Sequence, residues 1–182
     1  MDQKTEAEIV VRILKGDRQA YALLVEEYKT VLYSLAYRMT GQAEDAQDLA
    51  QESFLQAYKN LFRFDTKRSF YTWLYSVSLN VIRNHLKRSK SKRYDLQYDK
   101  ISSENFSASS QPACFIEDKA REELLQSCLP ELSPDIRELL VLRYYQNLSF
   151  ESIAEITGLS VSAVKMRVYR GLEKLRKIME NM

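Results

Sequence analysis

Glycine and proline are scarce in this sequence, with 4 and 3 copies among 182 residues. Because tight turns depend on these two residue types, their scarcity favours helices over a many-stranded sheet. Apolar and polar residues nowhere alternate for long, which argues against half-buried strands. We therefore expect an all-α fold, made of two small helical domains joined by a flexible linker.

Cysteine and histidine are almost absent. Cys114 and Cys128 lie 14 residues apart and the one histidine, His85, is far upstream, a pattern of neither a disulfide framework nor a zinc site. With no glycine-rich phosphate loop either, we expect no metal, no cofactor and no catalytic residue. The longest unbroken apolar run has six residues, Ala20 to Val25, and no secretory leader pattern is visible. These absences predict a cytoplasmic protein.

Positive and negative charges are unevenly distributed, although the net charge is only +2. Residues 63–93 hold nine Lys and Arg against one acid, and residues 165–177 hold six against one. The segments 42–58 and 94–118 each carry a net charge of −4. Two basic blocks separated by acidic ones indicate two patches that face a polyanion; solvated helix faces are the alternative.

Apolar residues recur at helical spacing from residue 6 to about 90, and again from about 117. The intervening stretch contains SSENFSASSQPA, which is serine-rich and has no periodicity, as in a flexible linker. Beyond it, LSPDIRELLVLRYY begins a helix with Ser133 as the N-cap and Pro134 at the first position. We expect domains at 1–93 and 119–182, with the linker at 94–118.

The stretch FESIAEITGLSVSAVKMRVY, residues 150–169, has the pattern of a helix-turn-helix. Gly158 falls where the turn requires a positive φ, which glycine adopts without steric cost. The second helix of such motifs enters the major groove, where Lys and Arg bind guanine edges or phosphates. A hairpin of helices that merely pack is the alternative. The outward residues are Ser162, Lys165, Met166, Tyr169 and Arg170, with Arg167 at the edge.

The stretch SFYTWLYSVSLNVIRNHLKRSK, residues 69–90, combines aromatic and basic residues. On a helical wheel, the core face holds Tyr71, Tyr75, Ser78, Leu79, Ile82 and Leu86. Trp73 lies on the other side with Val77, Asn80, Asn84 and Lys87. A flat ring beside cations is typical of surfaces that stack single-stranded bases. The preceding loop adds Arg63, Lys67 and Arg68; the alternative is that Trp73 and Val77 cover a neighbouring helix.

Three carboxylates lie on one face of the preceding helix, because Asp45, Asp48 and Glu52 are spaced i, i+3 and i+7. A metal site would need a matching Glu-x-x-His set from a second helix, and none is evident. A charged surface for a basic partner is the favoured interpretation. A plain solvated face remains the alternative.

These pieces, in this order, resemble the extracytoplasmic-function group of bacterial RNA polymerase sigma factors. The resemblance rests on LLVEEYKTVLYSLAYRMTGQAEDAQDLAQESFLQAYKNLFRFD, then FYTWLYSVSLNVIRNHLKR, then LPELSPDIRELLVLRYYQNLSFESIAEITGLSVSAVKMRVYRGLEKLR. It implies that 1–93 is a region 2 type domain and 119–182 a region 4 type domain. Such a factor binds core polymerase at its clamp helices and flap, recognises promoters and promotes melting.

The resemblance also implies a role for each surface. The polymerase-binding residues would be Asp45, Asp48, Gln51 and Glu52. Those that open and read the −10 element would be Arg63, Asp65, Lys67, Ser69, Trp73, Asn80, Asn84 and Lys87. Those that read the −35 element would be Ser162, Lys165, Met166, Arg167, Tyr169 and Arg170. The family often has Arg at position 165 and a small polar residue at 166, so the −35 preference here is expected to differ.

The family further implies an anti-sigma partner, often tethered at a membrane, and no membrane insertion by the sigma factor itself. Two other classes stay open at this stage. One is an autonomous helix-turn-helix regulator whose first domain senses a ligand or dimerises. The other is an enzyme that uses Asp45, Asp48 and Glu52 as a metal site or His85 as a base. The basic residues around Trp73 favour a first domain that binds nucleic acid over either alternative.

Overall fold

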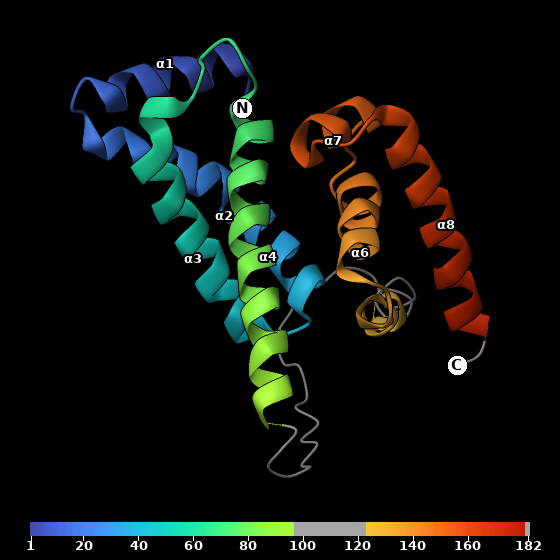
Figure 1. Ribbon diagram of the computed structural model, residues 1–182. Helices are drawn as coiled ribbons and strands as arrows, with labels where there is room; N and C mark the ends of the chain where they lie inside the picture. The colour runs from blue at the N-terminus through green and yellow to red at the C-terminus, as the bar shows by residue number, and fades with distance from the viewer. Residues whose placement is uncertain (97–122, 181–182) are drawn as a thin grey trace.

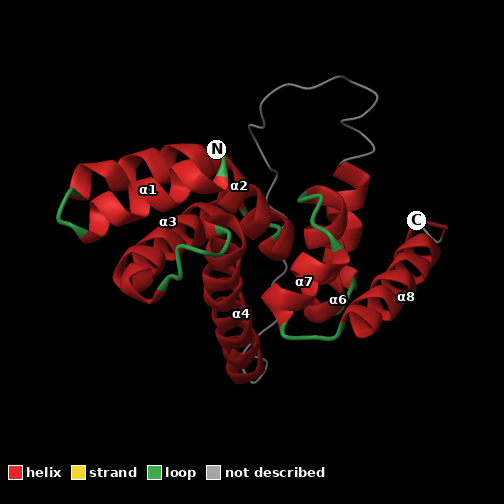
Figure 2. Ribbon diagram, turned by 90° about the horizontal axis from the view of Figure 1, so that it is seen from above, coloured by secondary structure: helices red, strands yellow, loops and turns green. Residues whose placement is uncertain are grey.

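The computed structural model describes residues 1–96 and 123–180, and this part of the chain contains helices and loops but no strand (Figures 1 and 2). It forms two helical domains, as expected. The first consists of α1 (Gln3–Leu14), α2 (Tyr21–Thr40), α3 (Ala43–Asn60) and α4 (Phe70–Leu96). The second contains α6 (Pro134–Leu140), a π-helical turn (Val141–Tyr145), α7 (Phe150–Thr157) and α8 (Val161–Glu180). Most of the expected linker, 97–118, lies outside the described residues; positions 94–96 close α4.

In the N-terminal domain, α2 and α3 form an antiparallel hairpin against which α4 packs. The hairpin turns at Gly41, which caps α2 at φ 78° and donates its N–H to the Tyr37 carbonyl at 2.7 Å. At the start of α1, the carboxylate of Asp2 accepts the Thr5 N–H at 2.8 Å, a side-chain N-cap. These local signals set where each helix begins and ends.

An aromatic cluster fills the end of this domain where α4 begins. Phe64 and Phe70 are buried and meet edge to face, with ring centroids 5.5 Å apart. Tyr28 reaches the cluster from α2, 5.9 Å from Phe70. Tyr21 donates its hydroxyl to the Phe54 carbonyl at 2.7 Å, which ties α2 to α3. The cluster therefore holds the first turn of α4 against α2 and the loop after α3.

The C-terminal domain contains the expected helix-turn-helix, made by α7 and α8. Gly158 caps α7 at φ 71°, the positive value that the turn requires. Ser149 opens α7 by accepting the Ser152 N–H at 3.0 Å. At the N-terminus of α6, Ser133 occupies the N-cap position with extended ψ, but its side chain makes no capping hydrogen bond. The inner residues are Ile153, Val164 and Val168, which are buried, and Leu159, Leu172 and Leu175, which are partly buried.

Helix α8 crosses α6 at Gly171, where the two helices approach closely. A Cβ added there would lie 2.6 Å from Cγ2 of Ile136, closer than side chains tolerate. The two domains also share a hydrophobic cluster: Leu35, Met39 and Leu79 of the first lie in it together with Leu129 and Leu139 of the second. As Figures 1 and 2 show, α4 lies between the α2–α3 hairpin and α6–α7. None of the described helices is long and apolar enough to cross a membrane.

Candidate nucleic-acid and protein interfaces

The first half of α8 presents a basic and aromatic face to solvent. Lys165, Arg167 and Arg170 are exposed, while Val164 and Val168 of the same helix are fully buried. Met166 and Tyr169 are large side chains left 48% and 61% exposed. Ser162 is exposed at the first turn. All six residues expected at the −35 element are therefore exposed on α8, with Arg167 at the edge, where it also lines a cavity between the two domains.

Phe150, the first residue of α7, lies beneath part of this face. The Lys165 ammonium is 5.5 Å from the Phe150 ring centroid, and the Arg143 guanidinium is 4.7 Å from it. The Tyr169 ring is 6.5 Å away. Cations near an aromatic face are attracted to it, so the ring orients Lys165 and Arg143. Sequence reasoning missed this supporting role; the signal available was an aromatic residue that opens the motif.

A second surface is a pocket of about 620 Å³ between α3 and α4. Of the residues expected at the −10 element, Arg63, Trp73, Asn80 and Asn84 line it. Asn80 and Asn84 are exposed, and the amide oxygen of Asn80 accepts a hydrogen bond from the Arg83 guanidinium at 3.4 Å. The pocket also includes Arg88, a further cation that the sequence interpretation did not single out, and the acidic Glu52.

Trp73 takes part in both the pocket and the aromatic cluster. Its ring lies 5.3 Å from Phe64 and 5.6 Å from Phe70, tilted in both cases. The side chain is half-buried and lines the pocket with its remaining surface. The Trp73 ring therefore packs on Phe64 of the loop and on Phe70 of its own helix, and its remaining surface lines the pocket; stacking of a base on it stays a prediction.

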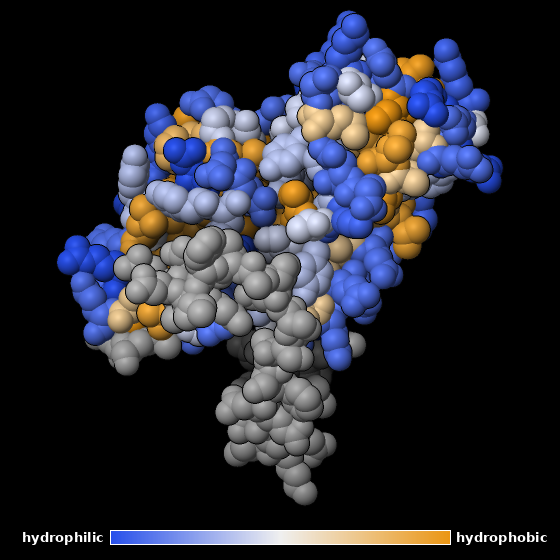
Figure 3. All heavy atoms as spheres, turned by 180° about the vertical axis from the view of Figure 1, so that it is seen from behind, coloured by the Kyte–Doolittle hydropathy of each residue, from blue (hydrophilic) through white to orange (hydrophobic). Residues whose placement is uncertain are grey.

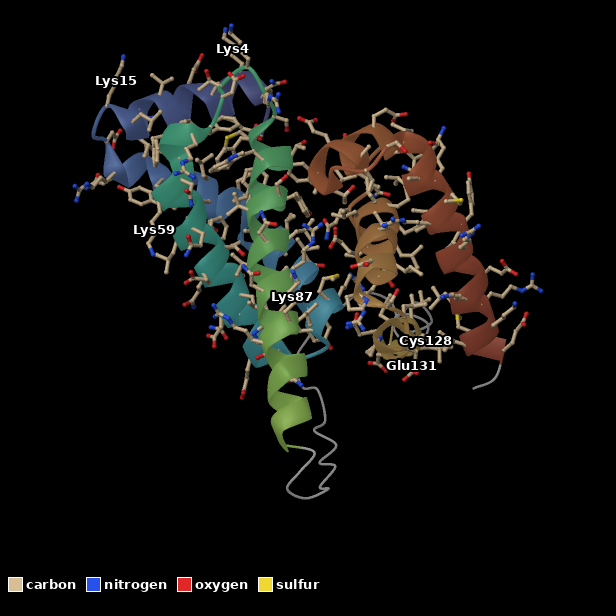
Figure 4. The ribbon with its side chains drawn as sticks, viewed as in Figure 1. Lys4, Lys15, Lys59, Lys87, Cys128 and Glu131 are labelled. Atoms are coloured by element: carbon tan, nitrogen blue, oxygen red, sulfur yellow. The ribbon has the colours of Figure 1, made fainter. Side chains whose placement is uncertain are left out.

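The loop before α4 is held by its own polar residues. Asp65 accepts the Lys67 N–H at 3.0 Å, and the Ser69 hydroxyl accepts the Thr72 N–H at 3.3 Å as α4 begins. Asp65 and Lys67 are exposed, as is Arg63 at the end of the turn after α3. The structure places Lys87 apart from this group, because it lines a different cavity on the side of α4 that faces the C-terminal domain (Figure 4).

The carboxylates of α3 form an acidic face that borders the pocket between α3 and α4 at Glu52. Asp48 and Gln51 are exposed; Asp45 and Glu52 are half-buried. Asp45 lies 3.3 Å from Nε2 of His85, and Glu52 accepts a hydrogen bond from Gln56 at 2.6 Å. Among the described residues no group of three potential ligands could hold a metal ion.

An apolar residue continues the acidic face and was missed from sequence. Leu55 follows Glu52 by three positions and is 55% exposed. Beyond the end of α3, Phe62 is also exposed, with the Arg63 guanidinium 5.2 Å from its ring. Seen from the opposite side, the molecule shows patches of apolar surface amid a mostly hydrophilic exterior (Figure 3). Exposed apolar side chains bordered by charge are common in protein interfaces.

Comparisons with known proteins identify the family of the chain. The family model described as Sigma-70 region 2 matches residues 24–92, and Sigma-70, region 4 matches residues 122–175. The chain is 34% identical over 175 residues to the ECF RNA polymerase sigma factor SigW of Bacillus subtilis, covering 92% of this chain and 93% of SigW. It is 30% identical to the RNA polymerase sigma-H factor of Pseudomonas aeruginosa, covering 99% and 96% of the two chains.

Solved structures show the same fold. CnrH, in complex with the cytosolic domain of CnrY, matches at a TM-score of 0.70 with 24% identity, covering 96% of this chain and 97% of CnrH. The sigma factor RpoE of Bartonella quintana, in complex with the anti-sigma factor NepR, also matches at 0.70, with 20% identity and coverage of 88% and 96%. Because the sequence identities are below 25%, these two structures show that the fold is the same and no more than that.

Proposed function

This chain belongs to the extracytoplasmic-function RNA polymerase sigma factors, and from that membership we propose how its surfaces divide the work of promoter recognition. As a sigma factor, it binds core RNA polymerase and directs transcription initiation at specific promoters. The observation that carries the division of labour is that each matched region contributes one helix with an exposed basic side, α4 in region 2 and α8 in region 4. The domain boundaries at 1–93 and 119–182 follow this division.

The acidic face of α3 is the docking surface for core polymerase in this proposal. Asp48 and Gln51 are exposed on it, with Asp45 and Glu52 at its edge and Leu55 as an apolar neighbour. Negative charge steers a basic partner and fixes its orientation, while an apolar residue at the centre adds affinity. The polymerase clamp helices are the proposed partner, and the flap is the proposed partner of the C-terminal domain.

The pocket between α3 and α4 is the proposed −10 site. Trp73 offers a ring on which an extruded base stacks, and Asn80 and Asn84 offer amides for its edge. The exposed loop with Arg63, Asp65, Lys67 and Ser69 borders the strand, and Lys87 binds phosphate further along α4. Stacking in this pocket competes with stacking in the duplex and thereby favours melting.

The exposed face of α8 is the proposed −35 site. Lys165, Arg167 and Arg170 are placed for guanine edges or phosphates, and Ser162, Met166 and Tyr169 for hydrogen bonds and apolar contact in the major groove. Lys165 donates as a point charge and cannot fork to a base as arginine does. The −35 sequence it prefers is therefore expected to differ from that read by an arginine at this position.

Further properties follow from the same proposal. The protein acts in the cytoplasm, where polymerase and chromosome are, and it needs no cofactor and catalyses no reaction. Membership of the family makes an anti-sigma factor a proposed partner. Such a partner would inhibit the protein by covering the acidic face of α3 and the basic faces of α4 and α8. The free protein is expected to bind DNA weakly and with a steep salt dependence, because polymerase supplies most of the affinity.

The test is transcription with purified components. The protein is added to core RNA polymerase and sheared genomic DNA, and the 5′ ends of the transcripts are sequenced. Initiation at a small set of sites that share two elements is the expected result. The competing function, an autonomous helix-turn-helix regulator, would instead leave core polymerase silent and bind duplex DNA alone at nanomolar affinity.

A further inference from the structure

Helix α1 lies outside the part of the chain that the region 2 model matches, which begins at residue 24. Its inner face belongs to the same hydrophobic cluster as Phe64 and Phe70. These two residues flank the −10 loop, residues 65–69. Helix α1 therefore packs against the core on which both ends of the loop are fixed. The buried apolar residues of α1 are Ile9, Val10 and Ile13.

A buried polar pair fixes α1 beside the start of α4. Glu6 of α1 is only 3% exposed, and its carboxylate accepts a hydrogen bond from the Tyr28 hydroxyl of α2. Burial raises the pKa of the Tyr28 phenol, and the bond to Glu6 raises it further, so the group stays a neutral donor. The Tyr28 ring also lies 5.9 Å from Phe70 and 5.8 Å from Tyr71. Because a buried carboxylate needs its donor, this pair sets the position of α1.

The −10 loop receives a hydrogen bond from the first residue of α1. The Gln3 side-chain amide donates to the Lys67 carbonyl at 3.1 Å, where the loop lies beside the N-terminal end of the helix (Figure 1). Within the loop, the Lys67 N–H donates to the Asp65 carboxylate at 3.0 Å, and the Arg68 N–H donates to the Asp65 carbonyl at 2.9 Å. Lys67 is thus held on its N–H by the loop itself and on its carbonyl by α1.

The residues proposed to read the −10 element are divided between this loop and α4. Asp65, Lys67 and Ser69 lie in the loop, and the Trp73 N–H donates to the Ser69 carbonyl at 3.2 Å where the loop ends. Sites on loops are less precise than sites on helices, and a binding site works only when its contact residues are held within about 0.5 Å. A donor on a packed helix gives the loop that support.

We propose that α1 positions the −10 loop for reading the extruded base, and that Gln3 is the positioning residue. The base-reading role rests on the proposed −10 site, whereas the support of the loop rests on the contacts of α1. A loop that is already held in its bound conformation loses less freedom on binding, so this support raises affinity for the strand. The preferred base gains most, because the other bases make fewer of the contacts that the loop fixes.

The test removes the donor at position 3 of the full-length protein. Gln3→Ala deletes the amide, and Gln3→Glu keeps its size but places an acceptor against the Lys67 carbonyl. Gln19→Ala and Gln19→Glu make the same changes at an exposed glutamine of the same domain and are the matched controls. Gln3→Arg restores a donor.

Two measurements are made on each variant. Hydrogen exchange, detected by mass spectrometry, reports the opening of residues 65–69 in the free protein. Fluorescence anisotropy reports binding of the holoenzyme to single-stranded oligonucleotides that carry the −10 sequence found by transcript mapping, with each of the four bases placed at each position in turn.

Gln3→Ala and Gln3→Glu should exchange the amide hydrogens of residues 65–69 at least about threefold faster than the wild type, as expected for the loss of one hydrogen bond. They should bind the preferred oligonucleotide about threefold to tenfold more weakly, and its advantage over the other bases should shrink at the extruded position. Gln3→Arg should recover the slow exchange. Urea unfolding of all variants should stay close to the wild type, as for exposed positions, and both Gln19 variants should match the wild type throughout.

The two measurements separate this inference from the function beneath it. Unchanged exchange at residues 65–69 in both Gln3 variants would overturn the support of the loop by α1. Faster exchange with unchanged discrimination between bases would overturn the positioning role. Exchange is measured without polymerase or DNA, so it decides whether α1 supports the loop even if the wild-type holoenzyme ignores the −10 bases, a result that would contradict the proposed −10 site instead.

Discussion

The two helices with basic faces, α4 and α8, are embedded to different depths. Helix α4 buries Leu74 in the core of its own domain and Leu79 and Ile82 in the cluster shared with the other domain, which it also contacts through Tyr75. Helix α8 buries only one stripe, and its residues from Lys165 to Arg167 are exposed in succession. On α8 the side chains proposed to read DNA are exposed beside one buried stripe, whereas on α4 the proposed DNA-reading residue Trp73 also packs in the aromatic cluster.

Trp73 is where this difference should be largest. Trp73→Ala removes a half-buried ring from contact with Phe64 and Phe70, which should lower the free energy of unfolding by about 2 kcal/mol, below the usual cost for a fully buried aromatic. It should also weaken promoter opening by at least about fivefold, since stacking contributes about 1–3 kcal/mol per base. Urea unfolding and permanganate footprinting of the open complex measure the two losses.

Trp73→Phe is the control, because it keeps an aromatic face and most of the packing. It should retain most of the stability and part of the opening. An alanine variant that opens promoters poorly but unfolds at the wild-type urea concentration would show that Trp73 acts on DNA alone, and the contrast between the helices would fail there.

Gly171 is the position at which a substitution on α8 should affect the stability of the fold, as Trp73→Ala does on α4. Gly171→Ala places a methyl group against Ile136 of α6 and should lower the free energy of unfolding by about 1–3 kcal/mol, the usual cost of overpacking. Because alanine favours helix more than glycine, a stabilised variant would mean that the α6–α8 crossing relaxes easily. Glu173→Ala, on the exposed side of the same helix, is the control and should unfold as the wild type does.

Arg170 tests the opposite case, in which binding is lost without stability. Arg170→Ala should reduce affinity of the holoenzyme for a −35 duplex about tenfold, or about 1.4 kcal/mol, within the range for one base contact. Its free energy of unfolding should stay within about 0.5 kcal/mol of wild type, as for exposed positions. Arg176→Ala removes an exposed arginine further along α8 and should change neither quantity. A clear loss of stability in Arg170→Ala would contradict the comparison.

Asp48 extends the comparison to the acidic face of α3, with the smallest effect. Its side chain is exposed, so it should behave as those on α8 do. Asp48→Asn should weaken core polymerase binding about twofold to fivefold, as expected for about 0.5–1 kcal/mol from one exposed charge, and should leave unfolding unchanged. The deficit should shrink at high salt, where exposed charges are screened. Glu8→Gln, an exposed acid on α1, is the control.

Local patterns predicted most of the fold. The spacing of apolar residues identified the helices, and Gly158 marked the turn of the helix-turn-helix, because positive φ is a local requirement with few chemical solutions. The exposed face of α8 was likewise predictable from the sequence, since helical periodicity turns Val164 inward and the next residue, Lys165, outward. The N-cap position of Ser133 was readable too, although its side chain forms no capping hydrogen bond.

Contacts between distant segments left no comparable signal. Arg83 and Glu138 form an ion pair between the domains but are 55 positions apart, and each looks like an ordinary charge of a solvated helix until the domains meet. The sequence likewise did not show how far Trp73 is buried, since this depends on the loop that brings Phe64 beside it. The support that Phe150 gives Lys165 depends on the angle between α7 and α8, which apolar spacing does not specify.

The hydrophobic cluster shared by the domains has a consequence for how the chain melts. Leu35 and Met39 of one domain lie in the same cluster as Leu129 and Leu139 of the other, so the unfolding of either half exposes apolar side chains that the other half buries. The two halves should therefore unfold as one cooperative unit, with a single calorimetric transition whose van't Hoff and calorimetric enthalpies agree.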